Sequence, residues 1–547
     1  MNNKILRLLL LALAAVSHTA VSNQQPPETT PVGLVRLSDA TDNRSRTWTG
    51  IGRLRGDNTS YCTASLIDTR TTDNPTGTTP AYIITSHRCL NSKNHGQYTY
   101  TGGIQHNTPT KGAIYFNNFD NTLDKIKNYE LKTIAWQSDG GLNLAIIELK
   151  APLSKLIADG IQPLKIARRT PPTGTEILTL GIPEYSNLHA THCTQQPAVN
   201  IASYPWVGTN VLANHCTNLT LGGLGGPVVD KASNELISVL LASTHGAISD
   251  DKCLANTPCE LTGNTTHWSP DTHYTQPVSF LNQCFVQGRL AATAPECALY
   301  KLTSVTLEEP SQPPARILEK LASEESHEPD TFAVGAAVGS PFYRYKYVHD
   351  ANTCHNSTGY SQAISSTETN INFTLNDDTG LHLLCIIGVE SHNDRLTSAQ
   401  FNAAKIIVTE RIAIKQEQAN HMKVSRSRKV DEFYYADWYH RSPLLGHYKV
   451  KYGPYESTDC TNNEGYIEIP DYEVRTRDSG PWAEEYEHKA HPTNPELILV
   501  KETKEQLIEG TYTKIIEPKE SVFKLCTVVF NLNNEPSEPR TDILRPL

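Results

Sequence analysis

The sequence lacks long apolar segments, long blocks of one charge and closely paired cysteines, and each absence excludes a class of protein. Beyond the first residues no stretch approaches about 18 consecutive apolar residues, which excludes a chain with several membrane-spanning helices. The formal net charge of −10 is spread along the chain, so neither nucleic acid nor an anionic membrane is an expected partner. Cys-x-x-Cys pairs are absent, which weakens zinc-binding and redox interpretations; we expect no metal and no other cofactor.

Length and composition indicate a globular protein with several domains. The chain has 547 residues, which corresponds to about three or four domains of ordinary size. With 38% hydrophobic residues, 33 Pro, 32 Gly and 24 Tyr, it is neither a disordered chain nor a multispanning membrane protein. Short strand-like runs at 81–86, 142–149, 176–182 and 235–242 are separated by Gly, Asn, Asp and Thr clusters. We therefore expect an all-β protein built from a barrel or a sandwich.

The N-terminus has the pattern of a secretory signal peptide. Lys4 and Arg7 precede an apolar run over 8–16, and small residues follow up to about residue 22. A permanent anchor is the alternative, but the run is too short to span a bilayer without help. We expect a signal peptide over 1–22, an extended Gln-, Pro- and Thr-rich leader over 23–34, no integral membrane segment after cleavage, and a secreted or periplasmic protein.

Twelve dispersed cysteines in an exported chain indicate disulfides, because the compartments outside the cytosol are oxidising. The segment 189–193, HATHC, and the pair His267 and His273 suggest a metal site as an alternative, but they lack ligand spacing. The cysteine pairs expected from position along the chain are Cys193–Cys216, Cys253–Cys259 and Cys284–Cys297.

An internal repeat occupies the C-terminal part of the chain. The segment 343–360 is echoed by 447–466, with alternating Tyr and basic residues, then a cysteine, then a Gly-Tyr pair whose Gly lies five residues after the cysteine. Both copies end in similar strands, at 381–388 and 522–529. Period-two alternation predicts half-buried strands. Each copy owns two cysteines, which predicts the disulfides Cys354–Cys385 and Cys460–Cys526.

These repeats define the expected domain map of the second half. We predict a linker over 301–332 with one short helix around 315–323, a β-sandwich module over 333–408, a basic connector over 409–432 and a second sandwich module over 433–547. Both modules resemble small immunoglobulin- or fibronectin-like sandwiches. The basic SRSRK segment of the connector is expected to be a solvated hinge. The greater length of the second copy predicts an inserted loop around 473–510.

Three blocks in the first half resemble the trypsin-like (chymotrypsin-fold) serine proteases. The first is YCTASLID at 61–68 with YIITSHRCL at 82–90, the second is LNLAIIEL at 142–149, and the third is GGLGGPVVD at 222–230. The segment TQPVSFLNQCF at 275–285 is similar to the end of secreted bacterial members. The resemblance implies a double β-barrel over 35–300 and a disulfide between Cys62 and Cys89.

The resemblance also places the family's catalytic triad on residues that cannot perform its chemistry. The base position, immediately before the block's second cysteine, is Arg88, whose guanidinium stays protonated. The acid position is Asn143, and the nucleophile position before Gly-Gly-Pro is Leu224, which has no nucleophilic atom. These substitutions predict a catalytically inactive homologue that works by binding a protein or an extended peptide.

Several alternatives stay open on the sequence alone. A one-residue shift would bring His87 into the base position, and the chain would then be an active secreted endopeptidase with a misaligned triad. The Gly-rich loop would form an oxyanion- or carboxylate-binding site through the amides of Gly222 and Leu224, or only a tight turn that closes the barrel. In a further alternative, residues 333–547 act as an adhesin and the barrel is a carrier.

Overall fold

The structure is a computed structural model of the whole chain. It describes residues 32–36, 45–56, 61–70, 77–91, 103–138, 141–183, 187–216, 223–245, 253, 257–299, 305–307, 316–318, 331–368, 370–375, 378–412, 422–428, 434–440, 445–469, 473–476, 486–490, 497–502, 511–516, 522–531 and 534–544. The expected signal peptide and most of the leader lie outside these residues. Within the described part of the chain, no helix is long and apolar enough to cross a membrane.

Six antiparallel strands close the first barrel. The circuit runs β2–β3–β4–β8–β7–β6 and returns to β2, because β7 pairs with both β6 and β8. Strands β3 and β4 are buried along their whole length, so both faces of these two strands are covered. The six strands are β2 (Ile51–Gly56), β3 (Cys62–Ile67), β4 (Pro80–Ser86), β6 (Gly112–Phe116), β7 (Lys127–Ser138) and β8 (Leu144–Pro152). Strand β5 (Ile104–Pro109) extends the sheet from β7.

The second barrel repeats this strand order. Its circuit is β9–β10–β11–β16–β13–β12, closed between β12 and β9. Numbered along the chain, both barrels therefore have the order 1-2-3-6-5-4. The strands are β9 (Glu176–Gly181), β10 (His189–Ser203), β11 (Trp206–Asn214), β12 (Pro227–Asp230), β13 (Leu236–Ser243) and β16 (His273–Pro277). β1 (Val32–Arg36) and β14 (Cys259–Thr262) add to β10, and β15 (Thr265–His267) pairs with β14.

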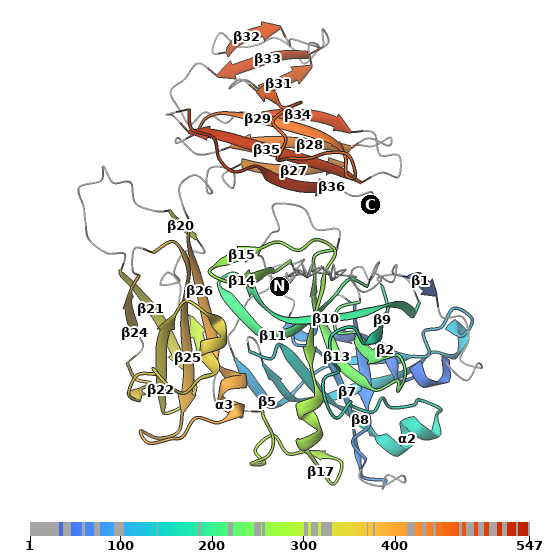
Figure 1. Cartoon of the computed structure of the whole chain (residues 1–547). Helices are drawn as coiled ribbons and strands as arrows, with labels where there is room; N and C mark the ends of the chain where they lie inside the picture. Colours follow the sequence, from blue (N-terminus) through green and yellow to red (C-terminus); the bar gives the residue numbers. More distant parts are fainter. Residues whose placement is uncertain are drawn as a thin grey trace, which may run out of the picture. The chain divides into compact units, whose positions relative to one another are not determined.

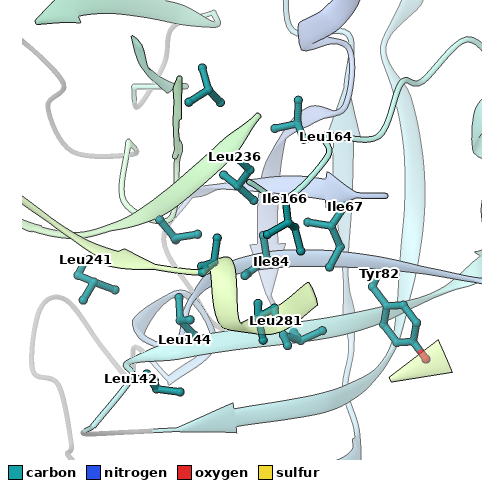
Figure 2. Packing of buried hydrophobic residues seen from close by; sticks show 14 of the residues in the cluster. Ile67, Tyr82, Ile84, Leu142, Leu144, Leu164, Ile166, Leu236, Leu241 and Leu281 are labelled. Carbon is teal, nitrogen blue, oxygen red and sulfur yellow. The ribbon is translucent and has the colours of Figure 1, made fainter. Parts of the chain in front are cut away.

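One apolar cluster joins the two barrels. Ile84 and Leu144 come from the first barrel, Leu236 and Leu241 come from the second, and Leu281 lies on the short 3₁₀ helix η4 (Ser279–Gln283) that follows it. All five are buried, and Figure 2 shows them in the cluster. The shared core fixes one barrel against the other, because burial of this apolar area is the main favourable contribution to folding.

The first C-terminal module is a sandwich of two sheets. Val334, Val338 and Ile371 of one sheet pack against Tyr343 and Leu384 of the other. The first sheet contains β19 (Val305–Leu307), β21 (Thr331–Val338) and β24 (Asn370–Thr374); the second contains β22 (Phe342–Val348), β23 (Ile364–Ser365), β25 (Gly380–Val389), β26 (Lys405–Ile412) and β20 (Arg316–Leu318). Helix α3 (Ser398–Ala403) lies beside β25 (Figure 1).

The second module repeats the central strand pair of the first. β29 (Leu445–Pro454) pairs with β35 (Phe523–Asn531) as β22 pairs with β25. Further strands are β27 (Met422–Arg428), β28 (Tyr434–His440), β30 (Ile467–Ile469), β31 (Glu473–Thr476), β32 (Tyr486–Ala490), β33 (Leu497–Glu502), β34 (Thr511–Ile516) and β36 (Arg540–Leu544). They form three sheets: β27-β28-β34, β30-β29-β35-β36 and β31-β33-β32.

A lysine-centred motif explains the sequence repeat. In the first module, Lys346 stands opposite Cys385, and its Nζ donates to the carbonyl of Asn356 at 2.6 Å. The hydroxyl of Tyr360 donates to the Cys354 carbonyl at 2.8 Å. In the second module, Lys451, opposite Cys526, donates to the Asn462 carbonyl at 3.1 Å. Tyr466 likewise donates to the Cys460 carbonyl at 2.8 Å. The repeated residues thus hold a cysteine loop against a strand.

All six expected disulfides are present, and no described cysteine is free. The pairs are Cys62–Cys89, Cys193–Cys216, Cys253–Cys259, Cys284–Cys297, Cys354–Cys385 and Cys460–Cys526.

The structure corrects four expectations on the second half of the chain. The predicted helix around 315–323 is wrong, because β20 occupies Arg316–Leu318 and pairs in parallel with β26. The first module extends to Ile412, because β26 continues past residue 408 in its sheet. The basic segment expected to be a hinge contains β27, whose alternation of Ser and basic residues has the period of a strand. The segment expected to be a loop, 473–510, contains β31, β32 and β33.

Candidate functional site

The three positions matched to the triad lie on segments that contact one another around Arg88. Arg88 opens the short helix α1 (Arg88–Asn91) after β4, Asn143 immediately precedes β8, and Leu224 precedes β12. The residues on either side of Arg88 contact the other two positions. The His87 amide donates to the Asn143 carbonyl at 3.2 Å, and the Cys89 sulfur lies 3.7 Å from the Leu224 carbonyl oxygen. The backbone therefore gathers segments that lie far apart in the sequence.

The base position and its neighbour are both buried. His87 is 3% exposed and Arg88 is 7% exposed. Cys89, bonded to Cys62 with a Cα–Cα distance of 5.8 Å, ties this turn to β3. A guanidinium has no acceptor atom and does not give up its proton at accessible pH, so Arg88 cannot serve as a general base.

Asn143 has a backbone conformation that few residues adopt. Its φ is +52°, in the left-handed region, which Asn and Asp tolerate better than most other side chains do. Its carbonyl is held by the His87 amide. The position thus fixes a turn before β8, and its amide side chain carries no charge that would stabilise an imidazolium.

Leu224, which the sequence resemblance matches to the nucleophile, has an apolar side chain. It is half-buried and packs against the apolar core of the first barrel. Its carbonyl accepts from the Thr63 amide at 2.9 Å, which anchors it to β3. An aliphatic side chain offers no electron pair for attack on a carbonyl, so this position forms no acyl-enzyme.

The Gly-Gly pair after Leu224 is constrained by its neighbours. Gly225 has φ of +79°, and a Cβ there would lie 2.0 Å from Thr85 Oγ1 and 2.4 Å from the Thr63 carbonyl oxygen. Only glycine fits, both in conformation and in space. The amide of Gly225 donates to the Leu240 carbonyl and that of Gly226 to the Gly223 carbonyl, each at 2.9 Å. In its described part the loop is a tight turn that closes the second barrel. Gly222, expected to supply an oxyanion-type amide, lies outside the described residues.

A buried histidine of the second barrel was noticed in the sequence only as a metal candidate. His273 begins β16 opposite Asn214 and Ser243, and burial lowers its pKa to about 4, with the nearby His245 acting in the same direction. His245 Nδ1 lies 3.0 Å from Asp271 Oδ1. His267, by contrast, is exposed on β15. Among the described residues, no group of three or more His, Cys, Asp or Glu side chains is arranged to hold a metal ion.

Sequence reasoning missed the polar residues that fasten the first module to the second barrel. Glu410 of β26 is 5% exposed and accepts from the hydroxyl of Tyr204 at 2.8 Å and from the amide of Thr266 at 3.1 Å. A single acidic residue within a strand-like run carries no signal of such partners, which lie about 150 to 200 residues away in the chain.

Comparison with known proteins finds similar solved structures but no matching family. No family model and no curated protein matches the sequence. Matching structures include the Rv3671c protease from M. tuberculosis in its active form, at 15% identity, covering 45% of this chain and 85% of that chain, with a TM-score of 0.28. The MamO protease domain from Magnetospirillum magneticum matches at 14% identity, covering 37% and 88%, with a TM-score of 0.26. Human heparin binding protein matches at 12% identity, covering 43% and 89%, with a TM-score of 0.26.

These low scores carry no argument about function, and the class of fold rests on the strand pairing. Two closed six-stranded antiparallel barrels of identical strand order define a trypsin-like, all-β double barrel. The same fold hosts active and inactive proteins, so the function has to be argued from the site.

Proposed function

We propose that this protein is an exported, catalytically inactive serine protease homologue that acts by binding a protein or an extended peptide. The observation that carries the proposal is Leu224. Its place before Gly225 is fixed by the Cys62–Cys89 disulfide and by the hydrogen bond from Thr63. Serine-type catalysis needs a nucleophile at this position, and removing one triad member already lowers the rate by several orders of magnitude.

The other two positions support the same conclusion. Arg88 supplies a permanent positive charge where the reaction needs a proton acceptor, and Asn143 supplies a neutral amide where it needs a carboxylate. Each of the three substitutions removes a reacting group of the triad. The disulfide and the Gly-Gly turn meanwhile keep the surrounding backbone in place. We infer that the scaffold is used for recognition, with an extended peptide held through backbone hydrogen bonds and side-chain pockets.

We further propose that the protein is secreted or periplasmic. Six disulfides among the described cysteines suit an oxidising compartment, and the first 22 residues have the pattern of a signal peptide. The tandem sandwich modules would then act as spacers or as recognition units of the exported protein, by analogy with such modules elsewhere.

Covalent labelling tests the proposal. The purified chain is incubated with a fluorophosphonate, which modifies an activated serine, and its intact mass is measured beside that of an active trypsin-like control. We expect no mass increase and no cleavage of a mixed peptide library. Stoichiometric labelling of any serine, or library cleavage above that of a heat-treated sample, would contradict the proposal.

A further inference from the structure

The first module is fastened to the second barrel by specific contacts. Trp206 of β11 pairs with Ile407 of β26, so one hydrogen-bonded sheet runs from the barrel into the module. Beside this pair, Glu410 is held by Tyr204 and Thr266. These contacts give the barrel–module junction a defined geometry.

The tip of the hairpin β14–β15 holds the loop over 378–381, which leads into β25. Asn264 at the tip donates its side-chain amide to the Thr379 carbonyl at 2.8 Å, and its Oδ1 accepts from the Leu381 amide, also at 2.8 Å. Between these two residues, Gly380 has φ of +117°, and a Cβ there would lie 2.0 Å from the Asn264 side-chain nitrogen. The hairpin can approach the loop this closely only because residue 380 is glycine.

The same contact buries apolar side chains of both parts. Leu381 is 1% exposed and shares an apolar cluster with Ala202 and Val207 of the second barrel and Val408 of β26. Leu261 of β14 packs against this cluster. Separation of the loop from the hairpin would expose this apolar area to water, and the cost of that exposure favours the closed junction.

A buried histidine supports the loop from inside the module. His382 is 2% exposed and lies on the face of β25 that carries Leu384, which packs inside the sandwich. Its Nε2 lies 2.9 Å from the Asp378 carbonyl oxygen, and its Nδ1 is hydrogen-bonded to the Tyr347 hydroxyl of β22. A carbonyl oxygen only accepts, so in the neutral ring Nε2 carries the hydrogen and Nδ1 accepts from Tyr347.

A second histidine, just beyond β22, supports the other end of the loop. His349 donates from Nδ1 to the Leu381 carbonyl at 2.7 Å. Its ring meets that of His382 edge-on, with the ring centroids 5.1 Å apart. The loop therefore lies between two histidine rings on the module side and the hairpin β14–β15 on the barrel side.

The surroundings of His382 disfavour a positive charge on its ring. Burial holds the pKa of His382 below its ordinary value of 6.5, and the nearby His349 and Arg411 act in the same direction. The hydrogen bond to the Asp378 carbonyl and the charge of Asp378 act against them. Glu410 lies on the other face of β26, where the barrel and the hairpin hold it. The strands of the covering sheet, β19, β21 and β24, contain no charged or titratable residue.

We propose that His382 is a pH-sensitive switch of the barrel–module junction: a proton taken up by Nδ1 of its ring releases the loop over 378–381 from the hairpin β14–β15. The protonated Nδ1 no longer accepts from Tyr347, and the charged ring is more stable where the loop has opened to water. The switch uses none of the residues matched to the triad, so it is independent of the proposed peptide binding.

The sign of the effect follows from the direction of the pKa shift. The ring binds a proton more tightly in the open junction than in the closed one, so opening is accompanied by proton uptake. The contribution of the neutral ring to the closed junction is complete above about pH 6.5 and is lost as the pH falls through the lower pKa of His382 in the closed state.

Hydrogen exchange of the full-length protein, followed by mass spectrometry, tests the proposal. Peptides covering 259–267 and 378–384 report on the hairpin and on the loop, and their protection is calculated relative to intrinsic exchange at each pH. His382→Gln removes the titrating ring but keeps a donor and an acceptor. Between pH 7 and pH 5, we expect protection in the wild type to fall by a factor at least about threefold larger than in His382→Gln.

Two control variants separate this ring from its neighbours. His392→Gln replaces an exposed histidine of the same module and should keep the wild-type pH dependence within about twofold. Glu410→Gln removes the junction carboxylate but keeps an acceptor for Thr266, and should also keep it within about twofold. Loss of the pH dependence in Glu410→Gln together with its retention in His382→Gln would assign the switch to the carboxylate and overturn the proposal.

A measurement on the wild type alone makes the test independent of whether a variant folds. Exchange at the C2 carbon of histidine rings, read by peptide mass, gives the pKa of His382. We expect a value below 6.5 that coincides with the midpoint at which the loop loses protection. The proposal is overturned if loop protection does not depend on pH, if His382→Gln behaves as the wild type does, or if this pKa is 6.5 or higher.

Discussion

The two barrels share one strand order but differ in the additional strands that pair with them. The first is a closed circuit extended by one strand, β5, and its β3 and β4 are buried throughout. The second accepts added strands at two places. β10 pairs with β1 and β14, and β11 pairs with β26 of the first module. With the same strand order, the first barrel is thus extended by one strand of its own, whereas the second barrel also pairs with a strand of the first module.

This difference suggests where function resides in the molecule. The segments matched to the triad come from both barrels, and a disulfide and backbone hydrogen bonds hold them together. Glu410 of the first module accepts hydrogen bonds from Tyr204 of the second barrel and from Thr266 of the hairpin β14–β15. Mutations made in one barrel at a time therefore test whether the two barrels have different roles.

The largest expected effect is loss of the disulfide in the first barrel. Cys62→Ala with Cys89→Ala opens a loop of 27 residues, and chain entropy predicts a loss of about 3.5 kcal/mol in the free energy of unfolding. The matched control, Cys253→Ala with Cys259→Ala at the second barrel, opens only 6 residues and should cost about 2 kcal/mol. Urea unfolding of the three proteins measures both values. A greater loss from the shorter loop would contradict the ranking.

A pH-dependent loss of about 3 kcal/mol is expected from the second barrel. The pKa of buried His273 falls from 6.5 to about 4 on folding, so the unfolded chain binds the proton more tightly. The contribution is complete above pH 6.5 and is lost progressively as the pH falls toward 4. Unfolding free energies between pH 7 and pH 4 should depend less on pH in His273→Leu than in the wild type.

The control for this pH series is an exposed histidine of the same domain. His267→Gln, on β15, should keep the wild-type pH dependence. Parallel curves for the wild type and His273→Leu would show that the buried ring contributes no pH dependence, against this prediction.

The smallest of the three effects concerns the turn before β12, which abuts Thr63 and Thr85 of the first barrel. Gly225→Ala forces a left-handed alanine and a clash with Thr63 and Thr85, for a loss of about 2–3 kcal/mol. Gly174→Ala has a similar φ of +86° but open space around it, and should cost about 1–2 kcal/mol. The difference between the two variants in thermal unfolding therefore measures the cost of the steric clash alone. Equal losses would mean that the turn is not clamped as described.

Much of the fold was predictable because its signals are local. The apolar runs at 81–86 and 235–242 became β4 and β13, and the internal repeat, with two cysteines in each copy, predicted the pair Cys354–Cys385. The residues matched to the triad come from three short sequence blocks, and their assignment stays a prediction. The repeat was visible because Lys346 and Lys451 serve the same local motif.

The junction was not predictable, for a physical reason. The pairing of Trp206 with Ile407 joins strands about 200 residues apart, and alternation of apolar residues shows that a strand exists but not which strand it pairs with. Strand β20, three residues long, has too few residues to display a period.

The most direct test of the central claim is to restore the chemistry at the three positions and locate the label. The variant Arg88→His, Asn143→Asp, Leu224→Ser and the wild type are treated with a fluorophosphonate and mapped by peptide mass spectrometry. The account predicts modification at position 224 in the variant and no modification in the wild type. Modification of a serine in the wild-type chain would contradict it.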